Sequence, residues 1–188
     1  MPRTLNLSQI KIATDYAIVI STNSGLWRYV IGDTIQFTQK KPYRFIISGR
    51  TKHYINSFGE ELMVHNAEAA LQQACISCNT ELVEFTVAPK QIYKGHKGCH
   101  EWLIEFKEAP ADLTDFTNKL DLALKAVNSD YEAKRHKNLI LESPKVHVAS
   151  NGLFFNWMRT RGKLGGQNKV PRLSGKRIYL DELLSMNS

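Results

Sequence analysis

The stretch VHNAEAALQQAC (residues 64–75), followed by LVEFTV (residues 82–87), decides the fold class. Apolar residues recur in the first stretch at the spacing of one helix face: Val64, Ala67, Leu71, Ala74 and Cys75. In the second stretch Val83, Phe85 and Val87 alternate with polar residues, which predicts a strand with one buried face. An amphipathic helix leading into such a strand predicts a layered α/β fold.

The segments on either side extend this pattern in both directions. A short strand at 54–56 and a turn at 58–61 precede the helix, and a strand at 102–106 follows the first one. Asp112 can cap a long helix that reaches Val127, and further elements are expected at 145–148 (a strand) and 153–161 (a helix). From Tyr54 to Val148 the order is β-α-β-β-α-β, which predicts a ferredoxin-like α/β (α+β) domain.

The first 48 residues have a different pattern, with strands and turns but no helical periodicity. Four strands are expected there: 16–21, 26–30, 34–38 and 44–48. The pattern changes at SGRTK (residues 48–52), where a glycine permits the backbone angles of a hinge. We therefore predict a strand-rich part (1–48), a hinge (49–53) and a self-sufficient C-terminal domain (54–188).

Composition and charge restrict the class of protein. Hydrophobic residues make up 43% and charged residues 23%, as in ordinary globular proteins, and no apolar run approaches the roughly 20 residues of a membrane span. The N-terminus has no apolar signal core, so a cytoplasmic protein without membrane contact is expected. The net charge is +7, and residues 134–177 hold eleven Lys/Arg and a single acid, Glu142. This block favours a polyanionic partner, although a solvated basic face is the alternative.

The three cysteines give a weak metal signal. Cys75 and Cys78 form a C-x-x-C pair, and zinc would find further ligands in His96, Cys99 and His100. Because Cys75 occupies a core-type position of the predicted helix, ordinary buried thiols explain the pattern better, and we predict no metal site.

Three segments together resemble one family: GLWRYVIGD (25–33), SGRTK (48–52) and GGQNKVPR (165–172). They are similar to the adenylate-forming enzyme superfamily, in particular its auxin-responsive acyl-acid amido synthetase family, from about Tyr16 onward. The resemblance implies that 1–48 ends an N-terminal adenylation domain and that 54–188 is the mobile lid domain. It implies a ligase that uses ATP with Mg²⁺ to adenylate a carboxylic acid, which is then conjugated to an amine, or to a thiol in the wider superfamily.

The resemblance also implies nucleotide-contacting residues. Asp33, in the Tyr29-x-x-Gly-Asp motif, would accept hydrogen bonds from the two ribose hydroxyls of ATP, and Tyr29 would lie in the same site. Arg50 would lie near the nucleotide, with Gly49 and Lys52 at the hinge. From the residues alone, Asp33 also fits a turn between strands, and Arg50 and Lys52 fit an exposed basic loop.

The catalytic residue implied by the resemblance is Lys169, which would close over the α-phosphate and neutralise the charge that develops there. Gln167 of the same motif would contact the nucleotide. Lys163 is the rival candidate, and without the resemblance Lys169 would be interpreted as a surface lysine.

No Ser/Thr/Gly-rich phosphate loop and no acid pocket precede Asp33 in this sequence, so we expect the 188 residues alone to be inactive. One alternative is a stand-alone basic ferredoxin-like module that binds RNA or another polyanion. The absence of an RNP-like aromatic octamer argues against nucleic acid, and Trp102 and Phe106 are expected in the core. A structural interaction domain without a ligand is the third alternative, but it does not explain the paired motifs.

Overall fold

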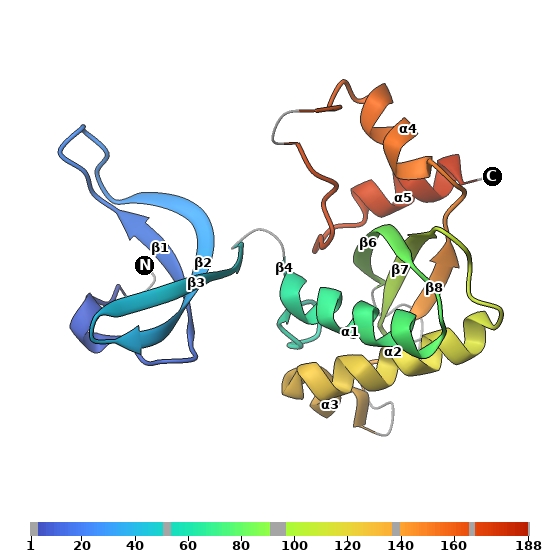
Figure 1. Ribbon diagram of the computed structural model, residues 1–188, viewed down its shortest axis with the longest axis horizontal. Helices are drawn as coiled ribbons and strands as arrows, with labels where there is room; N and C mark the ends of the chain where they lie inside the picture. The colour runs from blue at the N-terminus through green and yellow to red at the C-terminus, as the bar shows by residue number, and fades with distance from the viewer. Residues whose placement is uncertain (1–3, 51–53, 91–96, 137–139, 166–167, 188) are drawn as a thin grey trace. The chain divides into compact units, whose positions relative to one another are not determined.

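The computed structural model describes residues 4–50, 54–90, 97–136, 140–165 and 168–187 (Figure 1). The chain divides into two compact units, Met1–Lys52 and His53–Ser188, and each is described here by itself. The assignment of 1–48, 49–53 and 54–188 to an adenylation domain, a hinge and a lid stays a prediction. Within that hinge, Lys52 lies outside the described residues.

The first unit is a three-stranded antiparallel sheet in the order β1-β2-β3. Its elements are η1 (Leu7–Gln9), β1 (Asp15–Ile20), β2 (Tyr29–Lys40) and β3 (Tyr43–Arg50). The expectation of separate strands at 26–30 and 34–38 was wrong, because one strand, β2, begins at Tyr29 and continues without interruption past residue 38. The expected break is instead a bulge at residues 31–33 opposite Ile18, where the β1–β2 register shifts and Gly32 has a φ of 90°.

The second unit alternates strands and helices (Figure 1). Its elements are β4 (Tyr54–Ile55), β5 (Leu62–Met63), α1 (Val64–Ser77), β6 (Leu82–Lys90), β7 (Cys99–Phe106), α2 (Leu113–Val127), α3 (Ser129–Arg135), β8 (Lys145–Val148), α4 (Leu153–Thr160) and α5 (Ile178–Met186). The helices predicted at 64–75, 113–127 and 153–161 are confirmed, whereas β5, α3 and α5 were not foreseen. In α2 the predicted cap is present, since the Asp112 carboxylate accepts the backbone N–H of Thr114 at 2.7 Å.

The sheet connectivity departs from the ferredoxin-like expectation. In a split β-α-β-β-α-β fold the first strand joins the main sheet, but here β4 pairs with β5 in a two-stranded sheet of its own. The physical reason is the short turn after Ile55, which returns the chain directly so that Leu62 pairs with Ile55. Within the described segments, the main sheet has the order β6-β7-β8, with β6 antiparallel and β8 parallel to β7. The fold is therefore mixed α/β with three small sheets.

The central strand β7 is buried along its whole length because helices cover both faces of its sheet. Trp102, Ile104 and Phe106 join the core cluster formed with α1 and α2, which confirms that Trp102 and Phe106 are core residues. Leu103, which points the other way, packs in a second cluster with α4 and α5. Among the helices of the described segments, none has the length and apolar character needed to cross a membrane.

Candidate functional site

The structure places Asp33 in the β2 bulge of the first unit. Its Cα partner across the β2–β3 ladder is Arg50, and the next pair is Thr34 with Gly49. A second irregularity follows at once in β3, where the Ser48 hydroxyl donates to the Thr34 hydroxyl at 3.2 Å. Bulges re-aim side chains and are frequent beside active sites. Three of the predicted residues thus come together at one end of two paired strands.

The remaining motif residues of the first unit are arranged along the same strand. Tyr29 is the first residue of β2 and pairs with Ile20 of β1. Its side chain is 51% exposed, and that of its neighbour Trp27 is 82% exposed. Exposed aromatic rings such as these are suited to contact with a planar ligand.

Lys169 belongs to the second unit and lies in the segment between α4 and α5. Its side chain is exposed, as is that of Lys163. In the described part of the chain neither ammonium group forms an ion pair, so both are available to an anion. Gln167 lies outside the described residues.

The segment that carries Lys169 is attached to the edge of the sheet directly after the lysine. The Thr86 hydroxyl donates to the Pro171 carbonyl at 2.7 Å, and the Val87 N–H donates to the Arg172 carbonyl at 2.8 Å. Leu173 forms a parallel bridge with Val87 and is 1% exposed within the α1–α2 core cluster. Residues 171–173 therefore extend the sheet beside β6, so that the backbone directly after Lys169 is fixed on the sheet.

Arg172 strengthens this attachment through its side chain. Its Nε donates to the Glu84 carboxylate of β6 at 2.8 Å, and its Nη1 pairs with the Glu68 carboxylate of α1. The guanidinium carbon lies 5.2 Å from the centre of the Phe85 ring. Burial alone would lower the pKa of Arg172, but the two carboxylates raise it above its ordinary value. Arg172 lies in the GGQNKVPR motif (165–172), but the sequence alone indicates no role for it.

Among the described residues, five of the eleven Lys/Arg in the basic block at residues 134–177 pair with acids from outside it. Arginines and lysines of the block pair as follows: Arg135 with Asp121, Lys145 and Arg177 with Glu101, Arg161 with Glu182, and Arg172 with Glu68 and Glu84. The arginines of the block are therefore mostly internal partners rather than a continuous cationic surface. This distribution weakens the case for an extended polyanion such as RNA.

Glu101 is the centre of one of these ion-pair groups. Its carboxylate contacts His147 Nε2 at 2.7 Å, Arg177 Nη1 at 2.8 Å and Lys145 Nζ at 3.3 Å. Burial would raise the pKa of Glu101, but these three partners lower it to about 2. The group joins β7, β8 and Arg177, the N-cap residue of α5, and so fixes the last helix on the sheet.

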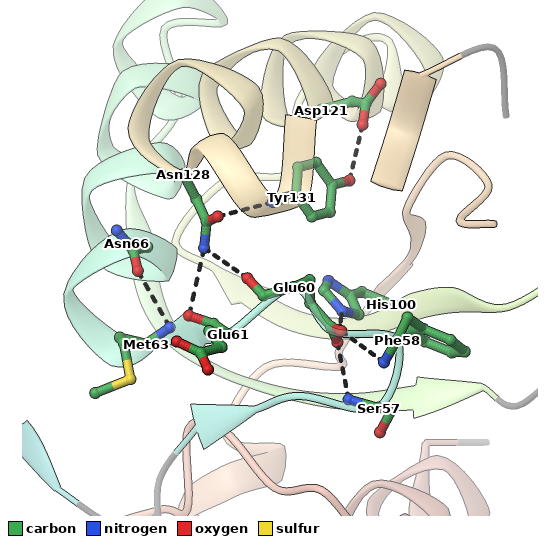
Figure 2. Close-up of polar contacts among 10 residues, drawn as sticks. All are labelled: Ser57, Phe58, Glu60, Glu61, Met63, Asn66, His100, Asp121, Asn128 and Tyr131. Atoms are coloured by element: carbon green, nitrogen blue, oxygen red, sulfur yellow. Dashed lines mark hydrogen bonds and ion pairs between the residues drawn. The ribbon is translucent and has the colours of Figure 1, made fainter. Parts of the chain in front are cut away.

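A buried polar network holds the turn between β4 and β5 (Figure 2). Glu60 and His100 are 0% and 1% exposed, and Glu60 Oε1 lies 2.9 Å from His100 Nε2. The Phe58 N–H donates to the same carboxylate at 2.7 Å, and the Asn128 amide donates to the Glu60 carbonyl at 3.0 Å. Burial would raise the pKa of Glu60, but His100 and backbone N–H groups lower it. Because neither side chain of the Glu60–His100 pair reaches solvent, we interpret the pair as structural.

Glycine is required at one position beside this network. A Cβ atom on Gly98 would lie 2.1 Å from the Phe58 ring, well inside van der Waals contact.

The cysteines have a structural explanation. Cys75 is 7% exposed in the core, and burial, followed by the charge of Cys78, raises the pKa of its thiol. The described residues contain no group of three metal-ligating side chains, and His96 lies outside them.

Comparison with known protein families shows which family the chain belongs to. The model of the GH3 family C-terminal domain matches residues 65–178, and that of the GH3 family central domain matches residues 1–50. The chain belongs to the GH3 family. This confirms the predicted resemblance to the acyl-acid amido synthetases.

Individual relatives agree with the family assignment. The GH3 chain is 29% identical to the indole-3-acetic acid-amido synthetase GH3.10 of Arabidopsis thaliana, over 94% of this chain and 31% of that protein. The solved structure of the GH3.15 acyl acid amido synthetase superposes with a TM-score of 0.75 at 21% identity, over 97% of this chain and 35% of that one. A 2-hydroxyisobutyryl-CoA ligase shares the fold with a TM-score of 0.56 at 15% identity, over 94% of this chain and 35% of its own.

The chain spans about a third of the length of these relatives. It is homologous to the C-terminal part of GH3 acyl-acid amido synthetases, which are adenylating ligases.

Proposed function

We propose that this GH3 chain supplies the C-terminal part of an ATP-dependent acyl-acid amido synthetase. One observation carries the proposal: Lys169 is exposed, has no ion pair among the described residues, and extends from a segment whose next residues are fixed on the sheet. Such a lysine can approach a phosphate held by another part of the enzyme without a rearrangement of its own domain. The names of the relatives, acid-amido synthetases, supply the substrate class.

In the first half-reaction, a carboxylate oxygen of the acid attacks the α-phosphorus of ATP, and the bond to the pyrophosphate oxygen breaks. Negative charge gathers on the α-phosphate oxygens in the transition state, and the Lys169 ammonium neutralises it there. Mg²⁺ accompanies ATP as part of the substrate. In the second half-reaction, an amine attacks the acyl carbonyl, the bond to the AMP oxygen breaks so that AMP leaves, and the nitrogen loses a proton to give the amide.

The residues of the first unit hold the nucleoside in this proposal. The two oxygens of the Asp33 carboxylate match the two vicinal ribose hydroxyls, and the bulge sets the direction of the side chain. Arg50, the Cα partner of Asp33, adds positive charge near the phosphates. In the same proposal Tyr29, together with Gln167 of the second unit, would contribute further nucleotide contacts, and residues 49–53, which include Gly49 and Lys52, would serve as the hinge.

A chimera tests this proposal directly. The last third of Arabidopsis GH3.10 would be replaced by the 188 residues, and exchange of pyrophosphate into ATP would be measured with a panel of carboxylic acids that includes indole-3-acetic acid. We expect exchange by the chimera and none by the 188 residues alone. Robust exchange by the 188 residues alone would contradict the partial-site proposal, as would a folded chimera that binds ATP but does not exchange.

A matched pair of substitutions in the chimera tests the nucleotide site. Asp33→Ala should raise the KM for ATP about tenfold or more, because the hydrogen bonds of a charged acceptor are lost. Asp15→Ala, at the exposed start of β1 in the same sheet, should leave this KM unchanged. Equal effects of the two substitutions would remove Asp33 from the site.

A further inference from the structure

The contacts of Arg172 point to a role that the family motif does not explain. We infer that Arg172 is a positioning residue for Lys169. By joining α1 to β6, it fixes residues 171–173, the segment from which the lysine extends. This inference rests on the proposed function of Lys169 and deepens it. In this account Arg172 does not itself contact substrate: its Nε and Nη1 donate to the Glu84 and Glu68 carboxylates.

Chain geometry makes the coupling short. Lys169 lies three residues before Arg172, so its Cα is within about 10 Å of the fixed point even in an extended chain. The main chain is held at Pro171 by the Thr86 hydroxyl and at Arg172 itself by the Val87 N–H. A displacement of residues 171–173 would therefore also displace Lys169. A shift of about 1 Å in the position of the lysine can lower the rate on the order of 100-fold.

The Arg172 clamp, which is the pairing of its guanidinium with Glu68 and Glu84, requires the shape of arginine and not only its charge. Nε and Nη1 reach carboxylates on two different elements, while the flat guanidinium lies over Phe85. A lysine is a compact point charge on a flexible stem and cannot make this fork. The interaction also joins sites far apart in sequence, since Glu68 is 104 residues from Arg172.

Arg177 provides a matched control within the same segment. It also pairs with two acids, Glu101 and Asp181, and its side chain is 30% exposed against 38% for Arg172. However, Arg177 lies eight residues after Lys169 and leads into α5. Its loss should reduce stability without moving the lysine.

The experiment is a double-mutant cycle in the chimera, read out as the rate of acyl-adenylate formation. Lys169→Ala should slow this step about 100- to 1000-fold, and Arg172→Gln about 10- to 100-fold, with the KM for ATP changed less than about twofold. The double variant should be no slower than Lys169→Ala alone, because Arg172 acts only through the lysine. Arg172→Lys should lose about as much as Arg172→Gln, and Arg177→Gln should stay within about threefold of the parent.

The outcomes distinguish the proposed function of Lys169 from the positioning role of Arg172. A normal rate in Lys169→Ala would contradict the proposed function. A slow Lys169→Ala combined with a normal Arg172→Gln, or with losses that multiply in the double variant, would overturn the positioning role alone. If Arg172→Gln does not fold, Glu68→Gln on the exposed side of α1 tests the same clamp. It should slow adenylation about threefold in the parent and not at all in the Lys169→Ala background.

Discussion

The two units of the chain use similar strand patterns but bury them to very different extents. In the first unit the buried apolar core consists of Ile10, Ile35 and Phe37, while Trp27 is 82% and Ile47 is 70% exposed. In the second unit the sheet β6-β7-β8 is covered on both faces, and two large clusters of buried side chains result. Phe85 and Trp102, for example, are fully buried and stacked with ring centres 6.0 Å apart.

The difference shows what alternation of apolar residues can and cannot provide. A strand presents one apolar face to whatever covers it, and only a second layer makes that face a core. The second unit contains its own covering helices, α1 and α2 on one face and α4 and α5 on the other. The described residues of the first unit contain no such helix, so its stability should depend on other contacts.

The largest expected effect follows from this comparison. Residues 53–188, made alone, should fold cooperatively, whereas residues 1–52 alone should not, because a sheet of three strands with so small a core cannot offset the entropy of chain ordering. Thermal unfolding followed by circular dichroism would test both pieces. A cooperative transition in residues 1–52 alone would contradict the comparison.

Single tryptophans sharpen the same contrast. Trp102→Ala removes a fully buried ring and should destabilise the chain by about 3–5 kcal/mol. Trp27→Ala, at an 82% exposed position, should change the free energy of unfolding by less than about 0.5 kcal/mol. Denaturant titration of both variants measures the difference, and similar losses would mean that the first unit is packed as tightly as the second.

Acid should weaken the second unit through Glu101. Its pKa in the folded protein, about 2, is below its ordinary value of 4.5, so its stabilisation is complete above about pH 4.5 and is lost as pH falls toward 2. A shift of this size corresponds to on the order of 3 kcal/mol. Glu101→Gln should therefore flatten the stability profile between pH 5 and pH 2 in denaturant titrations. An unchanged profile would show that the ion-pair group around Glu101 is not formed in solution.

The smallest effect is expected at an exposed ion pair of the same unit. Lys107 and Glu81 pair at 3.1 Å, and both side chains are 69% exposed. Lys107→Gln should change the free energy of unfolding by less than about 0.5 kcal/mol, since exposed pairs are screened and cost side-chain entropy. A loss comparable with that of Trp102→Ala would mean that surface charge, rather than the two-sided core, stabilises this unit.

Local signals predicted much of the fold. The helix at 64–75 and the Asp112 cap depend on residues within a few positions of each other, so periodicity and side-chain type were sufficient. The glycine at position 32 marked a break, but residue type alone could not distinguish a turn from the bulge that carries Asp33. The connectivity of β4 depended on which strand it pairs with, which periodicity does not encode.

The candidate site also combines residues that lie in local motifs with contacts between residues far apart in the sequence. Asp33 and Lys169 could be predicted as site residues because they lie in short contiguous motifs, and their roles remain proposals. The roles of Arg172 and of the Glu60–His100 pair depend on partners 104 and 40 residues away, and no local pattern indicates such contacts. The charge of the basic block was counted correctly, but its acidic partners come from other elements, so its surface potential could not be inferred.

The central claim is that Lys169, rather than its neighbour Lys163, serves the adenylation step. The most direct test is the single-turnover rate of acyl-adenylate formation by the chimera with either lysine replaced by alanine. Lys169→Ala should be slower by about 100- to 1000-fold with ATP affinity changed less than about threefold, and Lys163→Ala should keep nearly the parent rate. A collapse of the rate in Lys163→Ala, with Lys169→Ala close to the parent, would contradict the account.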